Sequence, residues 1–411
     1  MRLNTTPLAT VAVSRRQLLL GTAAASALPA AWAQSKVVPS WPEIEKAARG
    51  QTVYFNAWAG SETTNAYLKW VAGEVMASHG VKLEHVKITD TADVVKRVRA
   101  ERAAGRGEAE GTVDLVWING ENFAALKREG LLFGPFAETQ PNFQYVDVAG
   151  KPTVRNDFSV PTDGMESPWG MAQFTLFADG KRLPKPPQSM AELLALARSQ
   201  PGRITYPRLP DFTGTTFVKQ ALIEQVADVS LLTLPPVEAA FAQQTANLWK
   251  FLDALHPHLW RGGKQFPQNP AAVRQMMADG ELLLAMTFNP NEPANEIAAK
   301  RLSPSVISWQ FAKGTIGNTH FVAIPYNARA KAGAQVVSNF LLSAKAQARK
   351  ADIAEWGDPT VLDLKRLPPA ERALFPAKPL PGQVGQTAPT LPEPHAGWVD
   401  PLEKEWTRRY S

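Results

Sequence analysis

Apolar and polar positions alternate with two different periods along the first third of the chain. Residues 52–60 (TVYFNAWAG) and 81–89 (VKLEHVKIT) are rich in β-branched and aromatic side chains or alternate with period two, which is typical of strands. Residues 63–78 and 93–104 carry apolar side chains three or four positions apart, as helices do. A further apolar segment, residues 113–118 (VDLVWI), is again a strand. This β-α-β-α-β order predicts a parallel sheet covered by helices.

The pattern changes in the middle of the chain, where extended segments and loops replace the regular alternation. Residues 158–183 indicate a turn between two extended segments, and the second is long enough to leave one lobe and enter another. Residues 203–207 (RITYP) predict a short strand, and a helix is expected to begin near Thr215. Residues 269–302 then give a helix, a strand, the polar loop NPNEP and another helix. A second α/β lobe is therefore predicted.

The later part of the chain predicts a return to the first lobe. Residues 314–325 read as a strand, residues 332–351 as one helix, and residues 397–410 as a short helix anchored by aromatic side chains. We expect the hinge near residues 171–177 and 314–320. The predicted division is an export signal at 1–33, lobe I at 36–172 with 310–355, lobe II at 173–309, and a Pro-rich C-terminal segment at 356–411 that packs on the lobes.

Polar loops follow two strands of the predicted first sheet. Trp58 and Ser61 belong to the first loop, and residues 119–122 (NGEN) form the second. Because ligands bind outside the carboxyl ends of parallel strands, we expect both loops to lie side by side at a binding edge. The alternative is that Glu121 or Asn122 only caps the helix that Gly130 ends.

The N-terminus has the features of an export signal. Arg15 and Arg16 precede a mildly apolar stretch, and Ala31-Trp32-Ala33 forms a small-x-small cleavage site. The arginine pair favours the twin-arginine route, with a Sec signal as the alternative. Cleavage would leave 411 − 33 = 378 residues and lower the formal net charge from +6 to +3, since three arginines are lost. That charge argues against nucleic acid as a partner. With no cysteine, neither lipid attachment nor a disulfide is available, so we expect a freely diffusing periplasmic protein.

Three later motifs and their order are similar to those of a known family. The motifs are DGELLLAMTF (279–288), VAIPYNA (322–328) and VSNFLLSAKAQ (337–347). Together with the export signal, the βαβ lobe and the crossover, this order resembles the bacterial extracellular solute-binding proteins of ABC importers, over roughly residues 50–355. Within that family VWINGENFAALKREGLL (116–132) resembles the YnjB-like branch.

The resemblance implies a fold, a function and a set of cleft residues. The fold would be an α/β two-lobed periplasmic-binding-protein clamshell of type II topology. The protein would be a monomer that binds a small-molecule solute between its lobes and presents it to an ABC permease at the inner membrane. The implied ligand-binding residues are Trp58, Ser61, Asn119, Gly120, Glu121, Asn122, Asp163, Glu166, Trp169, Thr213, Gly214, Thr215, Thr216, Asn289, Asn291 and Glu292.

The charges among these residues bear on the solute. Trp58 and Trp169 offer faces for cation–π contact. The loop FTGTTF (212–217) instead suits an anionic oxygen, unless it only caps its helix. The acids that could act as counter-charges for a cation are Glu121, Asp163, Glu166 and Glu292. Four acids against one such loop favour a cationic or zwitterionic solute, thiamine-like or polyamine-like.

Signatures of enzymes and metal sites are mostly absent from the sequence. It lacks GxSxG, SxxK, HExxH, a P-loop and an intact GxGxxG. His256 and His258 are separated by Pro257, with no further ligand beside them, so a surface turn is favoured over a metal site. We therefore expect no cofactor and no enzymatic activity. The alternative is a secreted clamshell-shaped enzyme, a hydrolase or lyase that uses the same acids as an acid–base pair.

Overall fold

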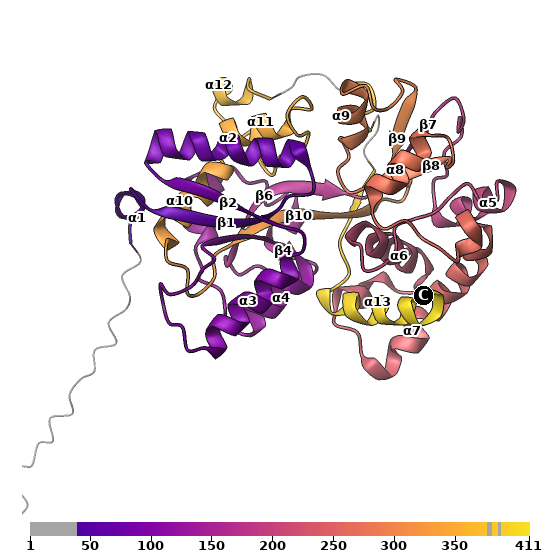
Figure 1. Cartoon of the computed structure of the whole chain (residues 1–411), viewed down its shortest axis with the longest axis horizontal. Helices are drawn as coiled ribbons and strands as arrows, with labels where there is room; N and C mark the ends of the chain where they lie inside the picture. Colours follow the sequence, from indigo (N-terminus) through magenta and orange to yellow (C-terminus); the bar gives the residue numbers. More distant parts are fainter. Residues whose placement is uncertain (1–38, 376–379, 385–387) are drawn as a thin grey trace, which may run out of the picture. The chain divides into compact units, whose positions relative to one another are not determined.

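The regular alternation in the first third of the chain builds a sheet that begins with three parallel strands. In this computed structural model, β1 (Thr52–Trp58) pairs in parallel with β2 (Lys82–Ile88) and β3 (Leu115–Ile118) (Figure 1). The connections are helices α2 (Glu62–His79) and α3 (Thr91–Ala103). The predicted parallel sheet is confirmed for these strands, and β1 and β3 are neighbours, as the two polar loops require.

Local signals set the ends of these helices. The Ser61 hydroxyl accepts the N–H of Thr64 and caps α2, and Gly80 ends that helix in the left-handed region at φ 64°. The Asp90 carboxylate caps α3 in the same way through the N–H of Ala92. The structure describes residues 39–375, 380–384 and 388–411, and Ser40–Ser411 form one compact unit. The predicted export signal lies outside the described residues.

The first sheet is completed by strands from later parts of the chain. β10 (Thr315–Ala323) runs antiparallel to β3 and to β6 (Glu166–Gln173), and β11 (Thr390–Leu391) pairs with β10 in parallel. The strand order is β11-β10-β3-β1-β2, with β6 also on β10. The other elements that flank this sheet are α1 (Trp41–Ala48), α4 (Gly120–Arg128), β4 (Asn156–Asp157), β5 (Val160–Pro161), α10 (Lys331–Leu341), α11 (Ala344–Ala351) and α12 (Pro369–Arg372).

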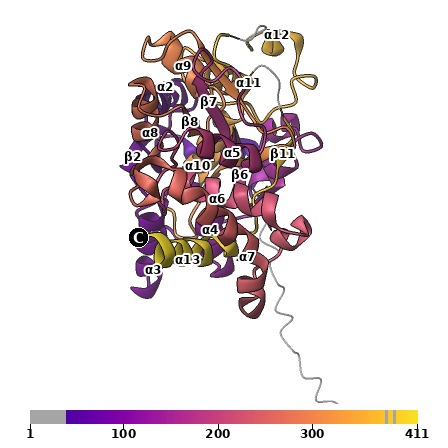
Figure 2. The same ribbon diagram turned by 90° about the vertical axis from the view of Figure 1, so that its right-hand side faces the viewer.

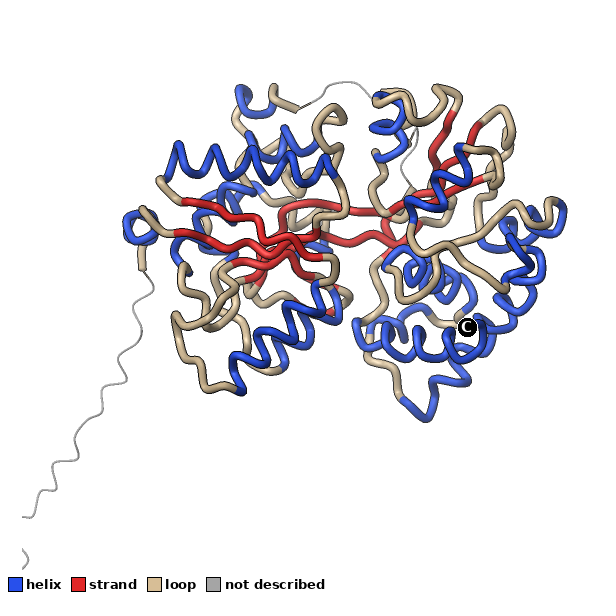
Figure 3. Tube along the Cα trace, viewed as in Figure 1, coloured by secondary structure: helices blue, strands red, loops and turns tan. Residues whose placement is uncertain are grey.

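A second sheet has three strands, all antiparallel. β7 (Thr175–Asp179) lies between β8 (Leu284–Thr287) and β9 (Val306–Trp309). β6 leads to β7 through Phe174, whose N–H donates to the carbonyl of Ile316 on β10 at 2.7 Å. Figure 3 shows these two stretches of strand running alongside each other from one sheet toward the other. They coincide with the predicted hinge, which stays a prediction.

Five helices surround the second sheet; one begins slightly earlier than expected, and residues 203–207 are not the expected strand. The helices are α5 (Met190–Ser199), α6 (Phe212–Gln225), α7 (Glu238–Leu255), α8 (Pro270–Ala278) and α9 (Glu292–Ala298). α6 begins three residues before Thr215, because Asp211 caps it. Residues 203–207 are not a strand, since Tyr206 stacks on Phe217 of α6 at 4.2 Å and fills a helical core. The carbonyl of Ile204 accepts the N–H of Trp260 and does not pair with a neighbouring strand.

The C-terminal segment crosses from the first sheet to the helices of the second. The predicted helix 332–351 is in fact α10 and α11, because Ser343 caps a new helix. α13 (Val399–Tyr410) lies beside α6 and α7 in Figures 1 and 2. Trp398 and Trp406 are fully buried in the same hydrophobic core as Phe217, which confirms the predicted aromatic anchoring. Among the described helices, none combines the length and the apolar character needed to cross a bilayer.

Candidate functional site

The polar segment that ends β3 forms the first turn of α4 and is held from two sides. The Asn119 amide donates to the carbonyl of Thr319 on β10 at 2.5 Å, and the Gly120 N–H donates to Asp157 at 2.6 Å. Gly120 has φ 61°, and a Cβ there would lie 2.7 Å from the ring of Phe158. Only glycine fits this close approach. The turn therefore places the next residue, a glutamate, at the start of the helix.

Glu121 is partly buried among charges that come from distant parts of the chain. The Asn122 amide donates to its Oε1 at 3.2 Å. Burial raises the pKa of Glu121, and a hydrogen bond to its own backbone N–H and the ammonium of Lys219 oppose that rise. The carboxylates of Asp400 and Glu393 raise the pKa further. This carboxylate thus faces α6 and the C-terminal segment.

The Gly-Thr segment opposite it is the first turn of α6, and its backbone donors are already occupied. The carboxylate of Asp211 accepts the N–H groups of Thr213 and Gly214 at 2.9 and 3.1 Å. The hydroxyl of Thr216 donates to the carbonyl of Phe212. The N–H groups of Thr213 and Gly214 are therefore not free for an anionic oxygen, and the residue that caps the helix is Asp211, which precedes FTGTTF. The hydroxyl of Thr215 donates to Glu403 of α13 at 2.7 Å.

A buried ion pair joins α6 to the C-terminal segment. The Lys219 ammonium lies 2.6 Å from Glu393, and the two side chains are 1% and 2% exposed. The ring of Phe158 lies 4.2 Å from the ammonium, and the Asn318 amide donates to the other oxygen of Glu393 at 3.3 Å. The Ser159 hydroxyl donates to the backbone carbonyl of Glu393 at 2.8 Å. The pair therefore ties together the loop after β4, strand β10, helix α6 and the C-terminal segment.

Carboxylates outnumber the cation in this region. Burial raises the pKa of Glu403 to about 7; the Thr215 hydrogen bond opposes the rise and the Glu121 carboxylate adds to it. Burial also holds the pKa of Asp157 well above its usual range. We call this group the acidic junction, and it consists of Lys219 and the mutually interacting acids Glu121, Asp157, Glu393, Asp400 and Glu403.

Two of the predicted cleft residues are core residues. Trp169 is 0% exposed, and its ring packs edge-on against Trp117 at 4.9 Å and against Trp356 at 5.4 Å. It offers no face to a solute, because neighbouring rings cover it. Glu166 is also buried, with no hydrogen-bond partner among the described residues, and burial holds its pKa well above the usual range. The structure therefore does not agree with the prediction for Trp169, whereas the prediction for Glu166 stays a prediction, since its unpaired carboxyl interacts electrostatically with Asp157 of the junction.

Two further predicted acids are engaged elsewhere. Asp163 is exposed at a turn and pairs with Lys127 near the end of α4 at 2.6 Å, away from the first turn of that helix. Glu292 pairs with Arg274 and accepts the hydroxyl of Thr287. Each is paired with a cation, and neither is among the charges that act on Glu121.

The remaining predicted residues lie at strand and helix ends. Trp58 is 43% exposed at the end of β1, and Ser61 caps α2. Asn291 donates to the carbonyl of Gly357, and its N–H donates to the side chain of Asn289. These contacts hold the loop after β8 and do not place it in the acidic junction.

The predicted surface turn at residues 256–258 is wrong for its first histidine. His256 is buried and bonded to the hydroxyl of Tyr206 at 2.7 Å, and burial lowers its pKa to about 4. Within residues 39–375, 380–384 and 388–411, no group of three or more His, Asp or Glu side chains could hold a metal ion.

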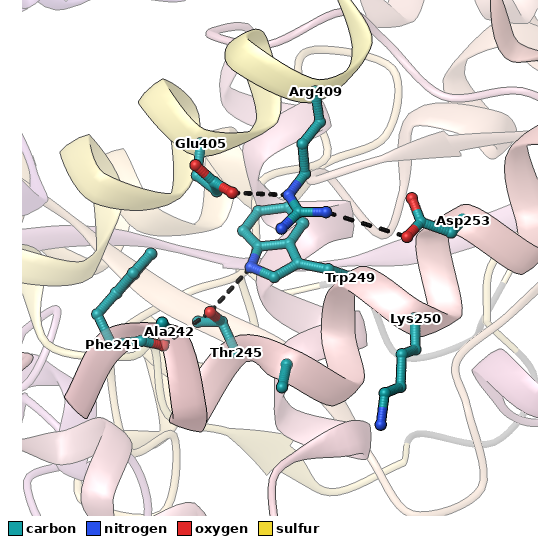
Figure 4. A pocket seen from close by; sticks show the side chains of 9 residues that line it. Phe241, Ala242, Thr245, Trp249, Lys250, Asp253, Glu405 and Arg409 are labelled. Atoms are coloured by element: carbon teal, nitrogen blue, oxygen red, sulfur yellow. Dashed lines mark hydrogen bonds and ion pairs between the residues drawn. The ribbon is translucent and has the colours of Figure 1, made fainter.

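A groove of about 350 Å³ lies between α7 and α13, and Figure 4 shows the side chains that line it. The guanidinium of Arg409 lies over Trp249 at 5.1 Å and pairs with Glu405 at 2.7 Å and Asp253 at 4.0 Å. The indole N–H of Trp249 donates to Thr245. These polar groups are already paired with one another, and none of the predicted residues lines the groove. The acidic junction is therefore the better candidate site.

Sequence reasoning missed the residues that complete the junction. Lys219 sits in the apolar helix sequence FVKQALI, where a buried lysine requires a counter-charge. Glu393 stands between two prolines and Glu403 lies in a helix outside the resemblance. A buried lysine was the one local signal, and it did not identify its partner.

Comparisons with known proteins agree with this architecture. Residues 70–363 match the model of the bacterial extracellular solute-binding protein family. The chain is 50% identical over 370 residues to Protein YnjB of Escherichia coli K12, covering 90% of this chain and 94% of that protein. The resemblance to the YnjB-like branch is thereby confirmed.

Two solved structures share the fold at low identity. The periplasmic binding protein AfuA from Actinobacillus pleuropneumoniae, with fructose-6-phosphate bound, has a TM-score of 0.60 at 14% identity, covering 88% of this chain and 99% of that one. The spermidine/putrescine ABC transporter substrate-binding protein PotD from Streptococcus pneumoniae has a TM-score of 0.58 at 12% identity, covering 88% and 96%. They confirm the two-lobed α/β fold of periplasmic binding proteins with type II topology. The chain belongs to the family of bacterial extracellular solute-binding proteins.

Proposed function

We propose that the protein is the periplasmic substrate-binding component of an ABC importer and that its solute is a small organic cation or zwitterion. It captures this solute between its lobes and delivers it to a permease of the inner membrane. Membership of a solute-binding family of the ABC transporter type supports the receptor role. The fold leaves the solute's charge open, since a similar structure holds fructose-6-phosphate and another is named for spermidine and putrescine. The charge of the solute depends on the residues of this chain's own site.

The excess of hydrogen-bond acceptors at the first turns of α4 and α6 carries this proposal. Helix N-termini usually attract anions through their free N–H groups. Here Asp211 already accepts two such groups of α6, and Asp157 accepts the N–H of Gly120 in α4. Glu121 and Glu403 add further carboxylates. A solute in this place meets acceptors rather than donors, so it has to bring donors or positive charge.

The chemistry of capture follows from these groups. A protonated nitrogen of the solute forms a charge-assisted hydrogen bond with the carboxylate of Glu121. Burial has raised the pKa of Glu121, so a neighbouring cation also relieves an unfavourable charge. Phe212 is 44% exposed at the start of α6 and supplies an apolar surface beside these acids. An organic cation with an apolar part fits both features.

The substitution Glu121→Gln tests the proposal. The solute is first identified by native mass spectrometry of gently purified protein, and its affinity is then measured by calorimetry. Glutamine keeps the size of the side chain but removes its charge, so affinity should fall by about 1 to 3 kcal/mol. The matched control is Glu129→Gln, which removes an exposed carboxylate paired with Arg99 from the other end of α4 and should leave affinity unchanged.

Two results would contradict the proposal. If Glu121 only caps α4, the substitution lowers the stability of the unliganded protein modestly and binding hardly changes. If the co-purified solute is converted during incubation, the protein is a clamshell-shaped enzyme and not a receptor. An unchanged solute whose affinity depends on the charge of Glu121 agrees with the proposal.

A further inference from the structure

The N-terminal end of α13 meets the two helices that begin at the candidate site. The short turn Ala396–Trp398 before α13 contacts α4, and α13 itself packs on α6. Val399 packs with Phe158, whose ring touches the position of Gly120. Figure 1 shows this end of α13 directed toward α4. Three helix N-termini from distant parts of the sequence therefore converge.

Glu403 of α13 is fixed in this convergence by a contact with α6. Its Oε1 accepts the hydroxyl of Thr215 at 2.7 Å, which orients the carboxylate. The charges that act on it come from every neighbouring element, namely Glu121 of α4, Lys219 of α6 and Asp400 of α13. Lys219 is already bonded to Glu393 at 2.6 Å. The chain thus offers Glu403 no cation of its own at contact distance among the described residues.

Two buried polar atoms at the same junction have no hydrogen-bond partner among the described residues, which is an observation independent of the acidic charges. Asp157 is 0% exposed; one oxygen accepts the N–H of Gly120, the Asn119 side chain also interacts with this carboxyl, and its Oδ1 has no partner within hydrogen-bond geometry among the described residues. Asn318 is also buried, and its Oδ1 lacks a partner while its amide donates to Glu393. Buried acceptors are nearly always bonded. The junction therefore has unpaired polar atoms that a molecule with several hydrogen-bond donors can bind.

We propose that Glu403 of the C-terminal helix is a specificity-determining residue of the solute site and that, with Glu121 from the opposite lobe, it holds a cationic nitrogen group bearing several N–H donors. An ammonium, amidinium or guanidinium group has this chemistry. This inference rests on the proposed function and adds that the C-terminal segment forms part of the binding site. Removing the segment is no test, because Trp398 and Trp406 belong to the hydrophobic core.

Proton release provides a readout that a purely structural role of Glu403 would not give. In the unliganded protein, burial, with Glu121 adding, raises the pKa of Glu403 to about 7, so at pH 6 it is mostly protonated. A cation beside it favours the carboxylate, so binding at pH 6 should release a proton. If only the ionised form binds, affinity should increase about tenfold between pH 6 and pH 8.

The experiment compares Glu403→Gln, Glu121→Gln and a matched control, Glu405→Gln. Glu405 lies on the same helix but pairs with Arg408 and Arg409, away from the junction. The probes are putrescine, spermidine, thiamine and, as an anion, fructose 6-phosphate. Calorimetry is run at pH 6 and pH 8 in two buffers of different ionisation enthalpy. Glu403→Gln should weaken the bound cation at least fivefold at pH 8 and abolish proton release, while the control stays within twofold of the wild type.

The outcomes separate this inference from the function on which it rests. A cation that is weakened by Glu121→Gln but not by Glu403→Gln would overturn the role of the C-terminal helix and leave the proposed function intact. Binding of fructose 6-phosphate and of none of the cations would overturn the proposed solute class itself. Should Glu403→Gln fold poorly, Glu403→Asp keeps a carboxyl on a shorter side chain, and the absence of proton release at pH 6 from both the wild type and this variant would count against the inference.

Discussion

The ion pair between Lys219 and Glu393 gives the most direct test of how the C-terminal segment is attached. Both side chains are almost fully buried, and the substitution Lys219→Met keeps an unbranched apolar side chain while deleting the charge. Glu393 then retains only the 3.3 Å hydrogen bond from Asn318. Leaving one partner of a buried pair uncompensated costs about 3 to 5 kcal/mol in unfolding free energy.

The loss of unfolding free energy in Lys219→Met should grow as the pH rises. Burial already raises the pKa of Glu393, and the ammonium of Lys219 opposes that rise. Without the ammonium, the folded-state pKa of Glu393 rises further above its unfolded value. A raised carboxyl pKa means that the folded state holds a proton that the unfolded state has lost. Stability of the variant should therefore be greatest near pH 5 and decrease toward pH 8, at about 1.4 kcal/mol per pH unit where only the folded state is protonated.

Urea unfolding at pH 5 and pH 8 measures both effects against a matched control. Lys345 pairs with Glu74 at the same 2.6 Å distance but is 59% exposed, so Lys345→Met should cost less than about 1 kcal/mol. The double variant Lys219→Met with Glu393→Leu should recover most of the loss, because no buried charge is left unpaired. If Lys219→Met behaves like Lys345→Met, the pair is not buried in solution and the attachment described here is wrong.

Three other outcomes are expected. Glu403→Gln removes a carboxyl whose folded-state pKa is about 7. The unfolding free energy of the unliganded protein should therefore rise by about 1 to 2 kcal/mol at pH 8, allowing for the partial exposure of this side chain, and change little at pH 5. Equal gains at both pH values would contradict this. Trp169→Ala should cost about 3 to 5 kcal/mol in chemical unfolding, since the ring is fully buried, and a loss under 1 kcal/mol would remove it from the core. Arg15→Lys combined with Arg16→Lys should leave unprocessed precursor in the cytoplasm on immunoblots, whereas normal processing would exclude the twin-arginine route.

The spacing of apolar residues predicted the helices and strands whose buried face is defined by their own sequence. β1, α2 and α3 lie where the spacing of apolar residues placed them, and the fold class followed from their order. The segment 203–207 failed because β-branched and aromatic residues also suit a helical core. Tyr206 is used in that way, against Phe217.

The candidate site was predictable only in part because half of it comes from distant sequence. Glu121 was found from its place at a strand end, and it does lie in the acidic junction. Lys219 and Glu393 are 174 residues apart, so their contact depends on where the C-terminal segment crosses the sheet. Trp169 was wrongly predicted to line the ligand cleft, because the crossover segment that contains it also contributes side chains to the core of the first sheet.

The hydrophobic core that Trp398 and Trp406 complete affects the order in which the protein can fold during synthesis. Apart from Leu402 of α13, its other buried members extend from Phe174 to Ile316, so they leave the ribosome about 80 to 230 residues before these tryptophans. At roughly 5 to 20 residues per second, the apolar surface that α13 covers stays open for several seconds or longer. The core around the second sheet is therefore complete only when the last residues of the chain have been synthesised and α13 has docked.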